Sequence, residues 1–206
     1  MISFVYFDLG GVVIRGFSGT NKWSAMKRNL RVLSDQEKDF DLFYDQNVLK
    51  IHIGLDVDSL IPQMKEKFHL TLPPNYSMLQ DFVDQFNANK LIWPVIDKVS
   101  RICKVGLLTN MYPRMFSGIC KRGLMPKTDW SVVIDSSVVK MQKPDKDIYE
   151  LAEQKVGFSG NQILFIDNTK ENLETAKTFG WKTFWYDSSD YESSTQELNK
   201  VLDFVL

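Results

Sequence analysis

Short apolar runs alternate with helix-like segments through the second half of the chain, and this alternation severely restricts the possible folds. Strands are predicted at residues 104–108, 130–134, 163–166 and 182–186, and helices at residues 94–101, 112–123, 144–156, 171–179 and 194–205. Strands that alternate with helices form a parallel sheet covered by helices on both faces. The sequence therefore predicts the α/β class.

The first ninety residues have a different character. An apolar run at residues 2–7 predicts the first strand, and residues 12–14 predict a short hairpin after it. Between residues 22 and 89, apolar and aromatic side chains recur at helical spacing, which indicates about four helices and no strand. We therefore expect an α/β core formed by residues 1–15 and 91–206, and an α-helical cap subdomain formed by residues 16–90, inserted over the strand ends.

Composition excludes several classes of protein. The 206 residues suffice for a core domain with an inserted subdomain, and a 44% apolar content excludes a wholly disordered chain. A net charge of −1 gives no sign of a nucleic-acid partner, and no apolar stretch approaches the roughly 20 residues that span a bilayer. Cys103 and Cys120 are too few for a disulfide framework, so we expect a reduced, cytoplasmic protein. We also expect a monomer or a small homo-oligomer.

Two carboxylates stand at the ends of predicted buried strands. Open parallel sheets bind ligands beyond the carboxyl ends of their strands. Asp8 follows the first apolar run and precedes two glycines, so it is either a nucleophile and metal ligand or a turn residue that caps a helix. Asp167 follows the strand at 163–166, where it either shares a Mg²⁺ ion with Asp8 or caps the next helix.

A hydroxyl and an ammonium group occupy comparable positions. Thr109 ends the strand at 104–108, where a hydroxyl and free backbone N–H groups can bind a phosphate oxygen; the alternative is another helix cap. Lys143 precedes Pro144 at a predicted helix start, where it adds positive charge to that end of the helix or lies in solvent as a surface lysine.

In their order and contexts these residues resemble the four motifs of the haloacid dehalogenase-like superfamily of phosphatases and related hydrolases. The resemblance covers nearly the whole chain, including the inserted helical cap. It rests on the motifs Phe7-Asp8-Leu9-Gly10-Gly11-Val12, Leu107-Leu108-Thr109-Asn110, Lys143-Pro144 and Ile166-Asp167-Asn168-Thr169-Lys170-Glu171-Asn172. The first motif is similar to that of phosphatases allied with the N-terminal domain of epoxide hydrolases and with sugar-1-phosphate phosphatases.

The resemblance implies a Rossmann-like core and a specific mechanism. Asp8 would attack phosphorus and form an aspartyl-phosphate, with Lys143 as the second catalytic residue. Mg²⁺ would be held by Asp8, Asp167 and the main-chain carbonyl of Gly10. The phosphate would be bound by Thr109, Asn110, Lys143 and nearby backbone N–H groups. Asn168 and Asn172 would be supporting residues.

Two positions depart from the family pattern. Asn168 stands where a second acidic residue is common. Gly10 stands where the family usually has a second Asp, which protonates the leaving group and later activates water. A positioned general acid or base typically raises the reaction rate by about 10²–10⁴-fold. Its loss need not abolish activity, and it should slow substrates with poor leaving groups most. We therefore expect a Mg²⁺-dependent phosphatase of small phosphorylated metabolites that favours good leaving groups, such as sugar-1-phosphates or acyl phosphates.

Two alternatives follow from the same residues. One is a dehalogenase on this fold, with an Asp nucleophile that attacks carbon and no need of Mg²⁺; the other is a catalytically weak or silent binding or regulatory protein. In the cap, Trp23 and Tyr44 are interpreted as packing residues and His52 as a packing or surface histidine. Asp45 or Asp41 could replace the missing acid, although nothing in the sequence places them at the site.

Overall fold

The computed structural model describes residues 1–17 and 19–205 and confirms the predicted α/β class. Within that part of the chain, five parallel strands form one sheet in the order β5-β4-β1-β6-β7. The strands are β1 (Phe4–Phe7), β4 (Lys104–Thr109), β5 (Val132–Asp135), β6 (Ile163–Asp167) and β7 (Lys182–Trp185). β1 is therefore the central strand, with β4 and β6 on its two sides.

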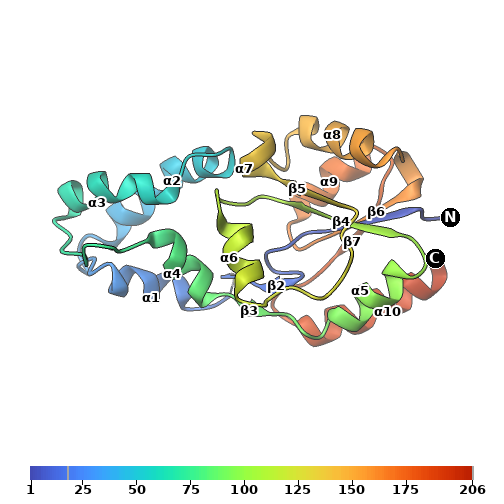
Figure 1. Cartoon of the computed structure of the whole chain (residues 1–206), viewed down its shortest axis with the longest axis horizontal. Coiled ribbons are helices and arrows are strands. Elements are labelled where there is room, and N and C mark those ends of the chain that lie inside the picture. The colour runs from blue at the N-terminus through green and yellow to red at the C-terminus, as the bar shows by residue number, and fades with distance from the viewer. Residues whose placement is uncertain (18, 206) are drawn as a thin grey trace.

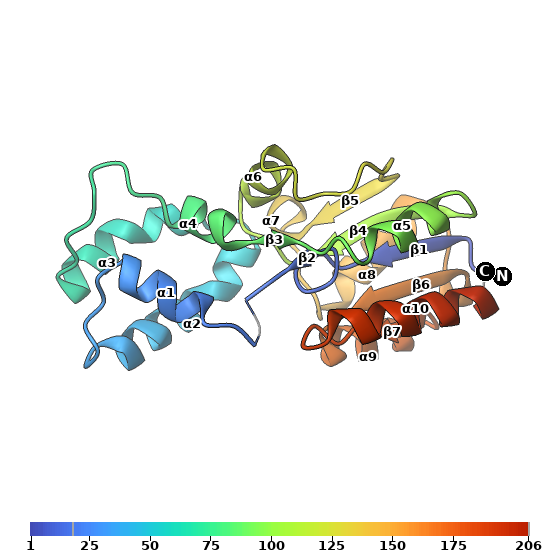
Figure 2. The same cartoon turned by 90° about the horizontal axis from the view of Figure 1, so that it is seen from below.

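Helices cover both faces of the sheet, as Figures 1 and 2 show. Side chains of β1 alternate between the two layers: Val5 and Phe7 pack into one apolar cluster, and Phe4 and Tyr6 into the other. The first cluster includes residues of α5 (Trp93–Ser100), α6 (Met115–Lys121) and α10 (Tyr191–Val205). The second includes residues of α8 (Lys146–Val156) and α9 (Lys170–Thr178), and α7 (Ser136–Val139) is a short helix after β5.

A second group of helices lies at the end of the molecule away from the two termini (Figures 1 and 2). It comprises α1 (Lys22–Asn29), α2 (Glu37–His52), α3 (Ile61–Phe68) and α4 (Met78–Gln85), with a 3₁₀ turn at Val57–Leu60. Aromatic side chains fill this group; the ring centroids of Trp23 and Phe82 lie 6.1 Å apart and those of Phe40 and Phe68 lie 5.2 Å apart. The helical interpretation of this segment is confirmed.

The expectation of no strand between residues 22 and 89 is wrong at one point. β3 (Asn87–Ala88) pairs antiparallel with β2 (Ile14–Arg15). A two-residue strand has no readable alternation of its own, and it forms because the partner segment at Ile14 lies beside it. This pair joins the two chain segments at which we propose that the cap begins and ends.

Helix limits differ from the sequence prediction mainly near the site. α6 begins at Met115 and not at residue 112, because the chain first passes through a loop in which Arg114 has a left-handed backbone (φ 69°). α7 went unpredicted, since four residues are too few for helical periodicity to appear. α8 begins at Lys146, after Pro144, and a 3₁₀ turn at Gly160–Gln162 precedes β6.

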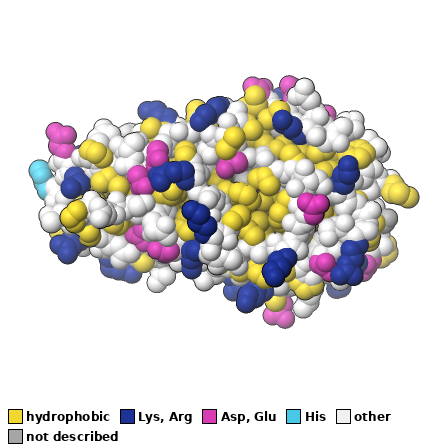
Figure 3. Space-filling model, viewed as in Figure 1, with side chains coloured by type: hydrophobic (Ala, Val, Ile, Leu, Met, Phe, Trp, Pro, Cys, Tyr) yellow, Lys and Arg dark blue, Asp and Glu magenta, His cyan; other side chains and the backbone are white. Residues whose placement is uncertain are grey.

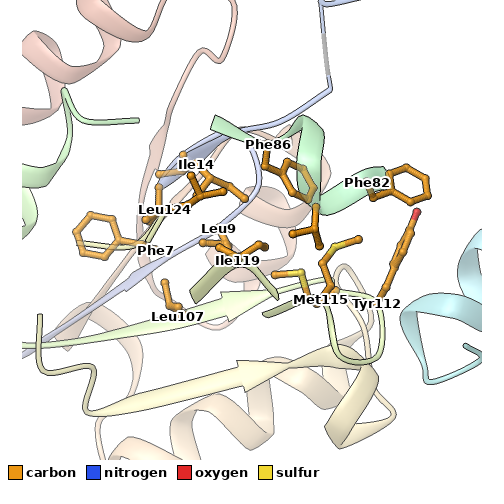
Figure 4. Packing of buried hydrophobic residues seen from close by; sticks show 14 of the residues in the cluster. Phe7, Leu9, Ile14, Phe82, Phe86, Leu107, Tyr112, Met115, Ile119 and Leu124 are labelled. Atoms are coloured by element: carbon orange, nitrogen blue, oxygen red, sulfur yellow. The ribbon is translucent and has the colours of Figure 1, made fainter. Parts of the chain in front are cut away.

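Apolar packing continues from the sheet into the second helical group. Figure 4 shows Leu9 and Ile119 near the sheet, with Phe82 and Tyr112 farther along the same cluster. On the face drawn in Figure 3, charged side chains of both signs are scattered and hydrophobic ones gather in the middle. Among the described residues, no helix has the length and apolar character needed to cross a membrane.

Candidate active site

Asp8 lies at the carboxyl end of the central strand, between the ends of its two neighbours. The preceding residue, Phe7, is in register with Leu107 of β4 and Ile166 of β6, and the Asp8 N–H donates to the Ile166 carbonyl at 2.8 Å. The sheet order thus brings the ends of three strands together. It is at such an edge that α/β sheets bind ligands.

A buried ammonium group joins the two predicted carboxylates. Lys143 Nζ lies 2.9 Å from Asp8 Oδ1 and 2.6 Å from Asp167 Oδ2. All three side chains are buried, and the Lys143 ammonium also lies 5.1 Å from the centroid of the Phe165 ring. Residues that are 135 and 24 positions apart in sequence therefore meet in one charged cluster. This cluster replaces the solvent-exposed interpretation of Lys143, which is wrong.

Two further hydrogen bonds fix the carboxylate of Asp167. The Thr169 N–H donates to Oδ1 at 2.7 Å, and the Asn172 side-chain amide donates to Oδ2 at 3.0 Å. The Asn172 carbonyl in turn accepts a hydrogen bond from the buried Tyr149 hydroxyl at 2.9 Å. The N-cap of α9 is Thr169 and not Asp167, so the structure does not support the helix-capping interpretation of Asp167, whose carboxylate faces Lys143 instead.

Burial dominates the electrostatics of Asp8. Removal from water raises the pKa of its carboxyl to about 6; the Lys143 charge opposes this and the Asp167 charge adds to it. Burial also acts to lower the pKa of Lys143, but Asp167 and Asp8 outweigh it, so that pKa is raised. Two carboxylates against one ammonium leave the cluster one negative charge in excess when all three groups are ionised.

Asn110 positions Lys143 through its side chain. Its amide donates to the Lys143 carbonyl and its oxygen accepts from the Lys143 N–H, both at 2.8 Å. The side chain is thus occupied, and any phosphate contact from Asn110 would come from its backbone. Thr109, which ends β4, is 1% exposed, and its hydroxyl makes no hydrogen bond with any described residue. That hydroxyl is free to bind a ligand.

The two glycines after Asp8 differ in what they require. Gly11 has φ +89°, and a Cβ there would lie 2.4 Å from Nδ2 of Asn168. Gly10 has no positive φ, and a Cβ there would meet nothing within 4 Å. Gly11 is therefore needed by the backbone and by the close approach of Asn168, whereas the structure leaves room for a side chain at position 10.

The donor set suits Mg²⁺. No group of three or more His, Cys, Asp or Glu side chains that could hold a metal occurs among the described residues. Mg²⁺ is instead bound in proteins through one or two carboxylates, with water and phosphate oxygens completing its shell. Asp8 and Asp167 supply two buried carboxylates with excess negative charge, and no described backbone hydrogen bond occupies the Gly10 carbonyl.

Two adjoining cavities lie beside this cluster. The first, of about 590 Å³, contains the catalytic candidates, and it is lined by Asp8, Gly10, His52, Asn110, Lys143, Pro144, Asn168, Thr169, Glu171 and Asn172. The second, of about 420 Å³, shares Gly10, His52 and Asn110 with the first and extends toward α1, α2 and α4. Both lie within or near the usual size of small-molecule sites.

Sequence reasoning does not place His52 at a site, and it names Asp45 or Asp41 only as a replacement for the missing acid. His52, at the end of α2, lines both cavities and its ring centroid lies 5.5 Å from that of Tyr112. Asp45 lines the second cavity, whereas Asp41 accepts hydrogen bonds from Trp23 and Lys27 instead. Helical periodicity marks these residues as members of a helix but carries no signal of which ones face a cavity.

Comparison with known protein families gives one match that covers most of the chain. The family model of haloacid dehalogenase-like hydrolases matches residues 2–180. An (S)-2-haloacid dehalogenase from Pseudomonas sp. (strain YL) is 28% identical over 65% of this chain and 52% of its own length. Bifunctional epoxide hydrolase 2 from Sus scrofa is 25% identical over 95% of this chain and 38% of its own length. The chain thus spans about half the length, or less, of these relatives.

Solved structures show the same fold at low sequence identity. A HAD family enzyme from Bacteroides thetaiotaomicron, in complex with magnesium and inorganic phosphate, has a TM-score of 0.74 at 17% identity, over 92% of this chain and 96% of its own. An L-2-haloacid dehalogenase from Xanthobacter autotrophicus, with chloropropionic acid covalently bound, has a TM-score of 0.60 at 19% identity, over 89% and 76% of the two chains.

Proposed function

The chain belongs to the haloacid dehalogenase-like hydrolase family, and from this premise we propose that it is a Mg²⁺-dependent phosphatase of small phosphorylated metabolites. The observation that carries the proposal is the buried Lys143 ammonium between Asp8 and Asp167. A cation held against a nucleophile at a strand end is what transfer of a dianionic phosphoryl group requires. The magnesium- and phosphate-bound enzyme of the same fold lends further support.

The proposed reaction has two displacement steps at phosphorus. A carboxylate oxygen of Asp8 attacks phosphorus, and the bond from phosphorus to the leaving oxygen breaks with its electron pair on that oxygen. Water then attacks phosphorus, the bond from Asp8 to phosphorus breaks, and inorganic phosphate leaves with Asp8 restored as a carboxylate. Protons reach the leaving oxygen and depart from the water by way of solvent, because Gly10 has no side chain to carry them.

The surrounding residues would position the nucleophile and the phosphoryl group and neutralise their negative charge. Lys143 holds the Asp8 carboxylate through its ammonium group, and Asn110 holds the backbone of Lys143. We propose that the free hydroxyl of Thr109 and neighbouring N–H groups bind phosphoryl oxygens. Asp8, Asp167 and the Gly10 carbonyl would hold Mg²⁺, which when bound offsets the repulsion between anionic nucleophile and anionic substrate.

The first experiment is a Mg²⁺-supplemented assay of phosphate release from a panel of phosphorylated metabolites. Asp8→Asn should lower turnover by roughly 10³-fold or more, because an amide of the same shape is a poor nucleophile. Asp129→Asn, which changes an exposed carboxylate at the opposite end of β5, should leave turnover unchanged. Turnover that survives in Asp8→Asn would reject the proposed mechanism.

A dehalogenase is the second candidate, and two observations favour it. Gly10 lacks the acid that a phosphatase of this family usually has, and one relative that matches 65% of the chain is a haloacid dehalogenase. The same Asp8 would then attack carbon and release halide. Asp167, held against Lys143, speaks for the phosphatase. Chloride release from a 2-chloroacid in a chelator, with no phosphate release in Mg²⁺, would reverse our choice.

Two further features of the proposal concern the cellular environment of the protein and its oligomeric state and partners. Cys103 and Cys120 are unpaired, which supports a reduced, cytoplasmic environment. We propose a monomer or a small homo-oligomer whose partner is its metabolite, with no nucleic-acid or membrane partner, as the near-neutral net charge of −1 and the scattered surface charges suggest.

A further inference from the structure

The second cavity, which we call the apolar chamber, opens directly beside the catalytic cavity. It has a volume of about 420 Å³ and shares Gly10, His52 and Asn110 with the catalytic cavity. A phosphoryl group held at Asp8 would therefore have its leaving group directed either to solvent or into this chamber. The chamber is large enough for a group such as a substituted benzene ring.

Aromatic and other apolar side chains form the walls of the chamber. The cap contributes Trp23, Tyr44 and Phe82, and the core contributes Tyr112, Met115 and Tyr191. Ring centroids of Phe82 and Tyr112 lie 5.3 Å apart at 88°, an edge-to-face contact. Figure 4 shows Phe82, Phe86, Met115 and Tyr112 at this part of the cluster.

The chamber provides no positive charge for a second anionic group. No Lys or Arg occurs among the described residues that line it, and Asp45 is the lining side chain with a full charge. His52 does not compensate, since burial lowers the pKa of its imidazole, and it is neutral at pH 7. A leaving group with its own carboxylate or phosphate would meet Asp45 and no cation.

Several polar side chains of the chamber already have partners, whereas Nδ1 of His52 has none among the described residues. The hydroxyls of Tyr44 and Tyr112 contact each other across the junction of cap and core, and the Asn110 side chain is bound to the Lys143 backbone. A sugar placed here would bury several hydroxyls without partners, and each unpaired hydroxyl is costly. An apolar ring has no hydroxyl to bury and so avoids this cost.

We propose that the substrate of this site is the phosphate monoester of an uncharged aromatic alcohol, with its ring in the apolar chamber. The inference rests on the proposed phosphatase function and makes its substrate class specific. It keeps the sequence-based expectation of a good leaving group but replaces its examples, sugar-1-phosphates and acyl phosphates, with leaving groups that carry a hydrophobic ring. A phenolate is also a stable leaving group, which fits a site with Gly10 in place of the general acid.

The test uses full-length protein with Mg²⁺ and three non-hydrolysable phosphonates, which separate binding from leaving-group reactivity. Calorimetric titration gives Kd for methylphosphonate, benzylphosphonate and 4-carboxybenzylphosphonate. Burial of a benzene ring should make benzylphosphonate bind about 10- to 100-fold more tightly than methylphosphonate. The added carboxylate should remove most of that gain. Turnover of acetyl phosphate, which has no ring, is measured in parallel.

A charge-reversal variant tests where the ring lies. Asp45→Lys places a cation at an exposed position of the chamber wall and should tighten binding of 4-carboxybenzylphosphonate relative to benzylphosphonate by roughly threefold to tenfold. Asp39→Lys makes the same change on the same helix at an exposed residue outside the chamber lining. The ratio of the two Kd values should stay constant in that control.

The binding measurements test the proposed substrate class, and the turnover measurements test the proposed phosphatase function. Equal Kd values for methylphosphonate and benzylphosphonate, or equal responses to Asp45→Lys and Asp39→Lys, would overturn the substrate class even if acetyl phosphate is turned over. Tighter binding of benzylphosphonate without any turnover of acetyl phosphate or phenyl phosphate would overturn the phosphatase function, while the chamber would stand as an aromatic-binding site. Tight binding together with turnover of phenyl phosphate supports both.

Discussion

The residue two positions after Asp8 is a glycine that the backbone does not require. Gly10 has no positive φ and open space where a Cβ would be, so the turn does not require a glycine at this position. The constrained residue is its neighbour Gly11, whose Cβ would collide with the Asn168 amide. The missing side chain at position 10 is thus a chemical feature of the site and no consequence of chain geometry.

Restoring a carboxyl at position 10 should therefore improve the chemistry without unfolding the protein. We expect Gly10→Asp to raise kcat/KM for alkyl phosphates by about 10²–10⁴-fold, because it supplies a proton to a poor leaving group. The gain should be far smaller for phenyl phosphate, whose leaving group needs no proton. Gly10→Asn, with the same shape and no acid, is the control; an equal gain in that variant would show that acidity is not the cause.

Lys143 holds two buried carboxylates that repel each other without it. We expect Lys143→Met to lower the free energy of unfolding by about 3–5 kcal/mol in metal-free buffer, since it leaves buried charge uncompensated. Added Mg²⁺ should then raise the melting temperature of this variant more than that of the wild type. Lys98→Met, which removes an exposed ion pair with Asp203, should cost less than about 1 kcal/mol. Equal Mg²⁺ responses would contradict the proposed metal site.

His52 gives a stability prediction with a definite sign. Burial lowers the pKa of its imidazole; a contact with Gln142 opposes this and the nearby Lys143 charge adds to it. The folded state then binds fewer protons than the unfolded state, so the contribution of His52 to stability is present above about pH 6.5 and lost as pH falls below it. The other titratable groups that line the same chamber as His52 are Asp45, Tyr44, Tyr112 and Tyr191.

The measurement is the difference in unfolding free energy between wild type and His52→Gln as a function of pH. Subtraction removes the opposite contribution of Asp8, whose raised pKa stabilises the fold as pH falls. The advantage of the wild type should shrink between pH 7 and pH 5. A constant or growing difference would mean that His52 is not buried as a neutral group.

At the scale of elements, the hydroxyl of Ser136 links the end of α2 by hydrogen bonds to the loop that follows β4. The Ser136 hydroxyl donates to the His52 carbonyl at 2.6 Å and accepts from the Met111 N–H at 2.9 Å. It thereby joins the cap helix, the loop after β4 and the start of α7 in the region where both cavities lie. These bonds place His52 beside Gly10 and Asn110, the residues that the two cavities share.

Loss of this hydroxyl should loosen α2 selectively. Ser136→Ala leaves the buried Met111 N–H and the half-buried His52 carbonyl unpaired and should cost about 1–3 kcal/mol, with faster amide hydrogen exchange in the last turn of α2. Ser137→Ala removes a neighbouring hydroxyl that bonds only within its own turn, to Asp135, and should leave exchange in α2 unchanged. Equal rates of amide hydrogen exchange in the last turn of α2 in the two variants would show that the Ser136 hydroxyl does not stabilise that turn.

The elements themselves were largely predictable, and the reasons are local. The strands β1, β4, β5 and β6 are short apolar runs that end at or just before a polar residue, so alternation with helices indicated the sheet and placed Asp8 and Asp167 at one edge. What escaped prediction was either very short, as with β3 and α7, or depended on an irregular backbone, as with the loop before α6. Such features depend on tertiary contacts that no periodicity records.

At the scale of the whole molecule, the catalytic cluster and the apolar chamber differ in how far the sequence revealed them. Lys143 and Asp167 follow recognisable motifs, and the fold brings them to Asp8. The chamber forms only where side chains from α1, α2 and α4 meet the loop and helix around Tyr112, so no motif describes it. We therefore propose that substrate choice is a property of the junction between cap and core, and that the chemistry is a property of the sheet.

The central claim is that Asp8 carries the phosphoryl group during turnover. The direct measurement is mass spectrometry of peptides from protein that is acid-quenched while it hydrolyses phenyl phosphate with Mg²⁺ present. We predict that the peptide containing Asp8 gains the mass of one phosphoryl group, and that the gain is absent from Asp8→Asn and from protein in chelator. Steady hydrolysis of phenyl phosphate with no phosphoryl group on that peptide at any quench time would contradict the claim.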